Sequence, residues 1–136
     1  MSDDIGLKVP GVILFTERFA ECVVFYRDLV GLPVWFAKDG LVCLRFGEGY
    51  LMVETGGVAG KGVKSPQQNP VVLRFNVMAL DRAVAVLRGR GIDVELLQFD
   101  WGSIGQFADP DGNLCELRYN DQSFGASATG QPLVSA

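Results

Sequence analysis

The sequence predicts an α+β fold built from two βαβββ modules. The prediction rests on an internal repeat: twice, an apolar strand precedes a stretch with helical spacing of apolar residues, and each such stretch ends at a glycine. The helical positions are Phe19, Cys22, Val23 and Tyr26 in the first copy and, 61 residues later, Leu80, Ala83, Val84 and Leu87 in the second. We expect three further strands after each helix.

The first module opens with the apolar strand 11–15. Its helix ends at Gly31, because glycine readily adopts the left-handed conformation of a helix C-terminal cap. Arg18 is a poor N-cap for this helix, and Thr16 is expected to take that role instead. The strands that complete the module are predicted at 32–37, 41–46 and 49–54, where apolar residues dominate.

The second module repeats this order with a strand at 71–75, a helix ending at Gly91, and strands at 92–97, 105–109 and 114–119. Residues 110–113, Pro-Asp-Gly-Asn, form a turn before the last strand. We therefore predict a single domain, 1–119, with modules at about 9–55 and 70–119. The Gly/Pro/Ser/Gln-rich linker 56–69 has the composition of a flexible connector, and 120–136 is expected to be a flexible tail that either frays or clasps a partner.

The composition excludes several classes of function and partner. The 136 residues suit one compact domain, and a net charge of −4 with scattered basic residues argues against nucleic acid as a partner. No apolar run is long enough to span a bilayer and the N-terminus does not resemble a signal peptide, so we expect a cytoplasmic protein without a membrane partner. Three cysteines without a CxxC pair are expected to be reduced core residues. Histidine is absent, which removes the commonest transition-metal ligand.

Strand alternation separates two faces of the predicted sheets. One face carries apolar residues that pack under the helices, such as Leu51, Leu73 and Leu117. The other mixes aromatic and charged side chains, and we interpret it as the lining of a concave ligand pocket, although a plain solvent face is the alternative. With Trp101, which precedes a strand, the candidate ligand-binding residues are Phe15, Arg45, Tyr50, Met52, Glu54, Arg74, Asn76, Glu116 and Arg118.

Two segments resemble the vicinal oxygen chelate superfamily, which includes glyoxalase I, extradiol dioxygenases and bleomycin-resistance proteins. They are "FYRDLVGLPV" after a short strand and "FADPDGNLCELRY" near the end, and the resemblance covers roughly residues 9 to 120. It implies that the two modules form a cupped, mixed β-sheet cavity with helices on the outer face. Such cavities are commonly completed by dimerisation, so a homodimer is expected.

The resemblance also implies where a metal would be held, since metal-dependent members bind a divalent ion with side chains from four strands. Carried onto this sequence, the positions are Gly11, Val72, Met52 (or Glu54 if the register slips) and Glu116. Only Glu116 matches the family pattern. Glycine, valine and methionine offer a hard divalent ion no ligand, and Glu54 with Glu116 would still leave the site incomplete. We therefore expect no metal and no cofactor.

Two main functional hypotheses follow. The first is a metal-free protein that sequesters a small molecule, as bleomycin-resistance proteins do, with Trp101 stacking on a planar ligand; packing in the core or an interface is the alternative for Trp101. Trp35 and Phe36 are expected in the strand core. The second is a glyoxalase-like lyase, an isomerase or a dioxygenase, with Glu116 as base or residual ligand and two arginines, Arg74 and Arg118, holding an anionic substrate.

Glu116 also has a structural interpretation, which we favour over catalysis. A carboxylate planted in a strand can form an ion pair with Arg74 or Arg118 across neighbouring strands, and a buried carboxylate needs such a partner to stay charged. A third hypothesis is a regulatory subunit that acts through its interface, and it predicts no ligand-sized cavity.

Overall fold

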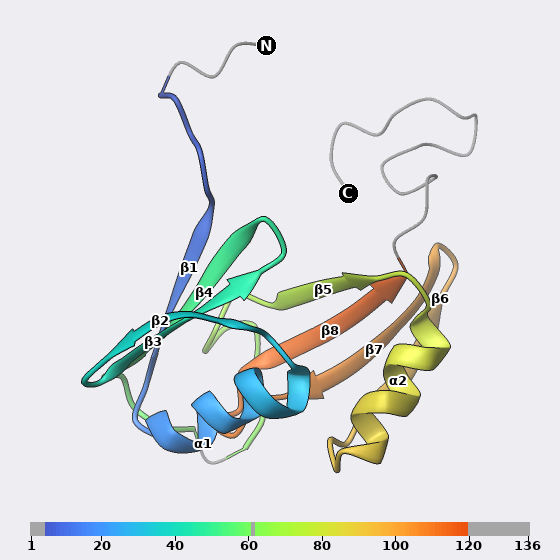
Figure 1. Ribbon diagram of the computed structural model, residues 1–136. Coiled ribbons are helices and arrows are strands. Elements are labelled where there is room, and N and C mark those ends of the chain that lie inside the picture. The colour runs from blue at the N-terminus through green and yellow to red at the C-terminus, as the bar shows by residue number, and fades with distance from the viewer. Residues whose placement is uncertain (1–4, 61, 120–136) are drawn as a thin grey trace. The chain divides into compact units, whose positions relative to one another are not determined.

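The computed structural model describes residues 5–60 and 62–119 (Figure 1), so the predicted tail lies outside the described residues. The chain forms two compact units. Among the described residues, the first contains 5–60 and 62–69 together with Ala108–Asn113, and the second contains Pro70–Phe107 and 114–119. The turn before the last strand therefore belongs to the first unit.

The first unit holds one four-stranded sheet. Its elements, in chain order, are β1 (Gly11–Thr16), α1 (Phe19–Val23), η1 (Val24–Val30), β2 (Val34–Lys38), β3 (Leu41–Phe46) and β4 (Gly49–Thr55). The strand order is β1-β4-β3-β2. The helical segment lets β1 pair parallel with β4, whereas β2, β3 and β4 pair antiparallel through short turns. The α1 helix packs on β4.

The second unit repeats the arrangement with β5 (Leu73–Val77), α2 (Leu80–Gly89), β6 (Glu95–Phe99), β7 (Gly102–Ala108) and β8 (Leu114–Tyr119). The strand order is β5-β8-β7-β6, with β5 parallel to β8, and α2 packs on β8 (Figure 1). The prediction of an α+β fold with two βαβββ modules is confirmed. No helix among residues 5–60 and 62–119 is long and apolar enough to cross a membrane.

Alternation along the strands places the core as predicted. On β4, Leu51 and Val53 are fully buried, and on β8, Cys115 and Leu117 are buried. The residues between them, including Tyr50 and Glu116, are half-buried. We call the face of each sheet opposite its helix the open face.

The helical segment of the first unit departs from the predicted α-helix. Only Phe19–Val23 is α-helical, and Val24–Val30 forms a π-helix. The wider π-helical turn accompanies burial of two adjacent rings, Phe25 and Tyr26, which meet edge to face with centroids 5.0 Å apart. The segment ends at Gly31 with φ of 93°, and Gly91 after α2 has φ of 88°, which confirms the two glycine caps.

Two strand boundaries differ from the prediction. The strand predicted at 71–75 begins two residues later, at Leu73. Leu73 pairs with Cys115, the second residue of β8, so the partner strand hardly extends beyond this pair. Val71 and Val72 precede the strand and are exposed. The strand predicted at 105–109 begins earlier, at Gly102, because Gly102 pairs with Phe99 across a tight turn.

Candidate functional site

The candidate residues lie on the strands of the open faces, or next to them, in two separate groups. The first unit carries Phe15, Arg45, Tyr50, Met52 and Glu54, and the second carries Arg74, Asn76, Trp101, Glu116 and Arg118. Strand register makes cross-strand neighbours of Phe15 and Glu54, Arg45 and Tyr50, Arg74 and Glu116, and Asn76 and Arg118. Each group is therefore assembled within one sheet.

The strand carboxylate Glu116 is paired with Arg74. The Arg74 Nε donates to Glu116 Oε1 at 2.5 Å, and the side chains are 35% and 13% exposed. This bears out the expected ion pair, with Arg74 rather than Arg118 as the partner. Because an arginine holds the carboxylate, Glu116 is poorly placed to act as a base or as a metal ligand.

Trp101 forms a stack with Phe99 at the β6–β7 turn. The two rings are nearly parallel, with centroids 4.9 Å apart, and the Arg118 guanidinium lies over the indole at 5.0 Å. Gly102 leaves room for this position of the guanidinium, because a Cβ there would lie 2.8 Å from a terminal Arg118 nitrogen, which would then have to shift. Trp101 is 54% exposed, so the second unit presents an aromatic surface next to a cation. Phe99 was not predicted as a site residue, and it precedes Trp101 by two residues.

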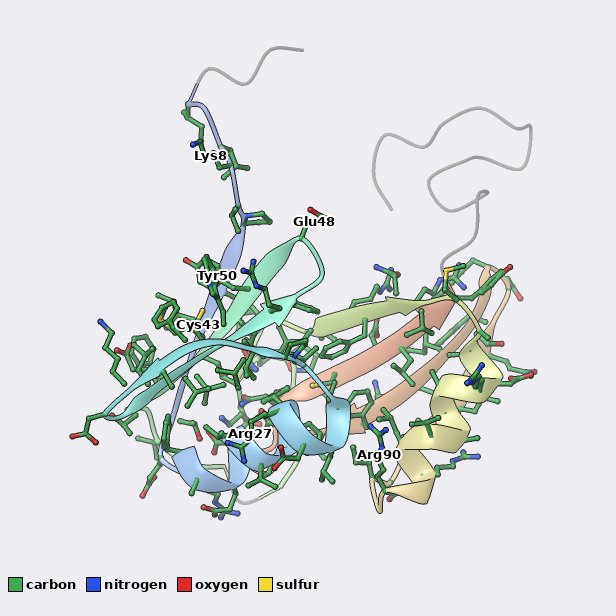
Figure 2. The ribbon with its side chains drawn as sticks, viewed as in Figure 1. Lys8, Arg27, Cys43, Glu48, Tyr50 and Arg90 are labelled. Carbon is green, nitrogen blue, oxygen red and sulfur yellow. The ribbon has the colours of Figure 1, made fainter. Side chains whose placement is uncertain are left out.

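In the first unit, the Tyr50 ring covers Gly11. Gly11 and Tyr50 are partners in the β1–β4 register, and a Cβ added at Gly11 would overlap the Tyr50 ring. The glycine is thus needed for the ring to lie across β1. Figure 2 shows Tyr50 and Cys43 projecting from the same region of this sheet, whereas Glu48 extends from the β3–β4 turn.

Trp35 and Phe36 are not core residues, contrary to the prediction. They are 44% and 38% exposed, because β2 is an edge strand and all five of its residues are exposed. The Trp35 ring lies 5.7 Å from Phe36 and 5.9 Å from Tyr50, and the Arg45 guanidinium lies over it at 4.3 Å. The sequence did not reveal this exposure, since strand alternation does not show which strand lies at the edge of a sheet.

The positions that the family uses for a metal do not fit one here. Gly11 has no side chain and is covered by Tyr50, Val72 precedes β5, Met52 offers a thioether, and Arg74 pairs with Glu116. In the described part of the chain, no group of three or more acidic or cysteine side chains is arranged to hold a metal ion.

The cysteines do not supply the missing ligands. Cys22, Cys43 and Cys115 are buried, and they form no disulfide within the described part of the chain. Burial raises the pKa of Cys22 to about 11 and also raises the pKa of Cys43, so these thiols stay protonated near neutral pH.

The turn at residues 109–113 is a structural clasp. Tyr26 donates to Oδ2 of Asp109 at 2.6 Å, and Asp109 Oδ1 accepts the backbone N–H groups of Asp111 and Asn113. The linker is anchored here as well, since Lys64 Nζ and Asn69 Nδ2 each donate to Asn113 Oδ1 at 3.0 Å.

A shallow cleft of about 520 Å³ lies beside this turn, lined by Arg18, Gly60, Gly62, Val63, Ala108, Asp109, Pro110 and Gly112. It contains none of the candidate ligand-binding residues. Arg18 donates to the Pro110 carbonyl oxygen at 3.2 Å, and Asp109 is engaged in the clasp. The charged side chains of this cleft are therefore already engaged in hydrogen bonds and are poorly placed to bind a ligand.

Solved structures share this fold at low sequence identity. A glyoxalase/bleomycin resistance protein/dioxygenase from Alicyclobacillus acidocaldarius has a TM-score of 0.71 at 17% identity, over 88% of this chain and 96% of that one. A lactoylglutathione lyase from Agrobacterium tumefaciens gives 0.62 at 20% identity, over 80% and 90%. TnmS3, an antibiotic binding protein from Streptomyces sp. CB03234, gives 0.62 at 21% identity, over 83% and 95%.

These neighbours include an enzyme and a binding protein, so the shared fold does not choose between the two functions. The model of one family matches residues 8–117, which include both repeats and the turn with its clasp. The chain belongs to the Glyoxalase/Bleomycin resistance protein/Dioxygenase superfamily.

Proposed function

We propose that this protein is a metal-free small-molecule-binding protein of the glyoxalase/bleomycin-resistance type, with its ligand held against the open faces of the sheets. The observation that carries the proposal is the chemistry of these faces. Each retains exposed aromatic rings beside an arginine, Trp35 with Arg45 and Trp101 with Arg118. Ligand sites combine apolar walls with a few polar groups in this way.

The residues at the positions where the family holds a metal also support the proposal, because they disfavour a metal-dependent enzyme. A catalytic divalent ion needs several oxygen or nitrogen ligands, and the equivalent positions here carry residues without them, apart from Glu116. The Arg74 guanidinium takes the place beside Glu116 that a cation would need. The antibiotic binding described for TnmS3 shows that this fold supports binding as a function.

The alternative function is a glyoxalase-like lyase, an isomerase or a dioxygenase that uses Glu116. The half-buried carboxylate on the open face favours it, because a strand carboxylate is a plausible base. For Glu116 to act, the ion pair with Arg74 must open, which costs the enzyme part of its binding energy.

Isothermal titration calorimetry with a panel of planar aromatic compounds, in buffer containing EDTA, tests the proposal. We expect saturable binding to the wild-type protein and weaker binding to the Trp101→Ala and Trp35→Ala variants. Lactoylglutathione formation, assayed in parallel with added Ni²⁺ or Zn²⁺, should stay at background. Turnover that requires a metal and is lost in Glu116→Gln would support the enzyme instead, and absence of any binding would contradict the proposal.

We further propose that the protein is a homodimer and is cytoplasmic. β1 is an edge strand of its sheet, and its open-face residues Ile13 and Phe15 are 50% and 52% exposed, which favours burial against a second copy. Buried cysteines that form no disulfide among the described residues fit a reducing compartment. Size-exclusion chromatography with light scattering at micromolar concentration checks the assembly, and a monomer would count against it.

A further inference from the structure

We infer that Arg45 is an anion-binding group of the open face in the first unit, and that its ligand is a planar aromatic carboxylate. This inference rests on the proposed binding function and names the ligand class. It is carried by three features of the first unit: an arginine without an acidic partner, an indole that holds it, and exposed rings beside both.

Arg45 is the open-face arginine of β3, and it is exposed. Its guanidinium lies over the Trp35 ring, with the guanidinium carbon 4.3 Å from the ring centroid, and it forms no ion pair with an acidic residue among the described residues. The ion pairs in this part of the chain join other residues: Arg27 with Asp28, Lys64 with Asp111, and Arg74 with Glu116. Glu48 extends from the β3–β4 turn without forming an ion pair with Arg45 (Figure 2). The donors of Arg45 are thus available to a ligand.

The contact with Trp35 prepares the guanidinium for binding. Its N–H donors lie in its own plane, so a position over an indole leaves them free while it restricts the side chain. The indole is itself held against Tyr50, and the Tyr50 ring lies over Gly11. A preorganised arginine loses less conformational entropy when it binds a carboxylate with two parallel hydrogen bonds.

The neighbouring surface explains why the ligand should also be flat and aromatic. Trp35 and Phe36 are 44% and 38% exposed and meet at 72°, so they offer an apolar corner next to the cation. An aromatic ring can contact this corner while its carboxylate reaches Arg45. A neutral or cationic aromatic compound would leave the local positive charge of Arg45 uncompensated, whereas a carboxylate would neutralise it.

The test compares two ligands of equal shape, 2-naphthoate and 2-naphthamide, by isothermal titration calorimetry. The wild-type protein should bind the carboxylate about tenfold more tightly than the amide, as expected for a charge-assisted hydrogen-bonded pair. Arg45→Gln should abolish this preference and leave affinity for 2-naphthamide within about twofold. Arg27→Gln removes an equal charge from an exposed arginine on the helical segment and should leave the preference intact.

A second pair of variants tests the role of the indole. Trp35→Leu should weaken 2-naphthoate binding more than Trp35→Phe, because phenylalanine still offers a ring beneath the guanidinium. Circular dichroism checks that every variant is folded.

The outcomes separate this inference from the proposed function. Equal affinity for the carboxylate and the amide, or a preference that survives Arg45→Gln, would overturn the inference while the binding function stands. If no compound of either this pair or the wider aromatic panel binds, the proposed function fails and the inference fails with it.

Discussion

The hydroxyl group of Tyr26 donates a 2.6 Å hydrogen bond to Asp109, a residue 83 positions away in the sequence. Both side chains are buried, at 0% and 5% exposure. The bond joins the two segments that identify the family, "FYRDLV" and "DPDGN", and holds the turn of the second repeat within the first unit. The two segments are therefore partners in one structural clasp.

Tyr26→Phe should destabilise the protein by about 1–3 kcal/mol, because it removes a donor from a buried carboxylate. Urea denaturation gives the free energy of unfolding. Tyr50→Phe is the matched control, since no hydrogen bond of the Tyr50 hydroxyl is found among the described residues; its effect should stay within about 0.5 kcal/mol. Equal effects of the two substitutions would show that the clasp adds little.

Glu116→Ala should cost about 1–2 kcal/mol of stability, less than the 3–5 typical of a fully buried pair, because solvent reaches Arg74. A double-mutant cycle with Arg74→Ala measures the coupling energy between the two side chains. Additive effects would mean that the pair contributes nothing. Asp28→Ala, which breaks an exposed pair with Arg27, should have no measurable effect.

Gly11→Ala should destabilise the first unit by about 1–3 kcal/mol, because the added methyl group overlaps the Tyr50 ring. Gly11→Ala should cost less stability in the Tyr50→Ala background than in the wild-type protein, because the ring that the methyl group overlaps is then absent. Gly89→Ala, at the end of α2 with no heavy atom near its Cβ position, should instead be neutral or stabilising by up to about 1 kcal/mol. Thermal and urea unfolding distinguish these results, and a tolerated Gly11→Ala would contradict the close packing.

Stability should fall as the pH rises above about 9. Burial raises the pKa of Cys22 from 9.0 to about 11, so between these values the unfolded chain loses the thiol proton while the folded chain keeps it. The contribution of the buried Cys22 thiol to the free energy of unfolding is therefore complete below pH 9 and is lost toward pH 11. Urea denaturation at pH 8 and pH 10 should show a smaller decrease for Cys22→Val than for the wild-type protein. Equal decreases in the two proteins would show that ionisation of Cys22 does not cause the loss of stability.

The helical spacing of apolar residues and the alternation along strands were enough to predict most of the fold. Strand alternation identified Leu51 and Leu117 as core residues, because their strands are regular and each is covered on one face by a helix. The same parity placed Glu116 opposite the core, and the parallel β5–β8 pairing then set Arg74 beside it. These features follow from local spacing and the repeat.

The remaining features depend on strand order and on departures from regular geometry. The exposure of Trp35 and Phe36 follows from the position of β2 at the edge of its sheet, which strand alternation does not show. The π-helix keeps the apolar pattern of an α-helix, so its wider turn was missed. The contact between Phe99 and Trp101 arises across a tight turn, where neither helical nor strand spacing applies.

The central claim is that this chain binds a small aromatic ligand without a metal. The most direct test is the affinity for 2-naphthoate measured by calorimetry on protein from which metals and then EDTA have been removed, first without metal and then with one equivalent of Ni²⁺ or Zn²⁺. The account predicts the same affinity in both conditions and no change in Glu116→Gln. Binding that appears only with the metal, and disappears in Glu116→Gln, would contradict it.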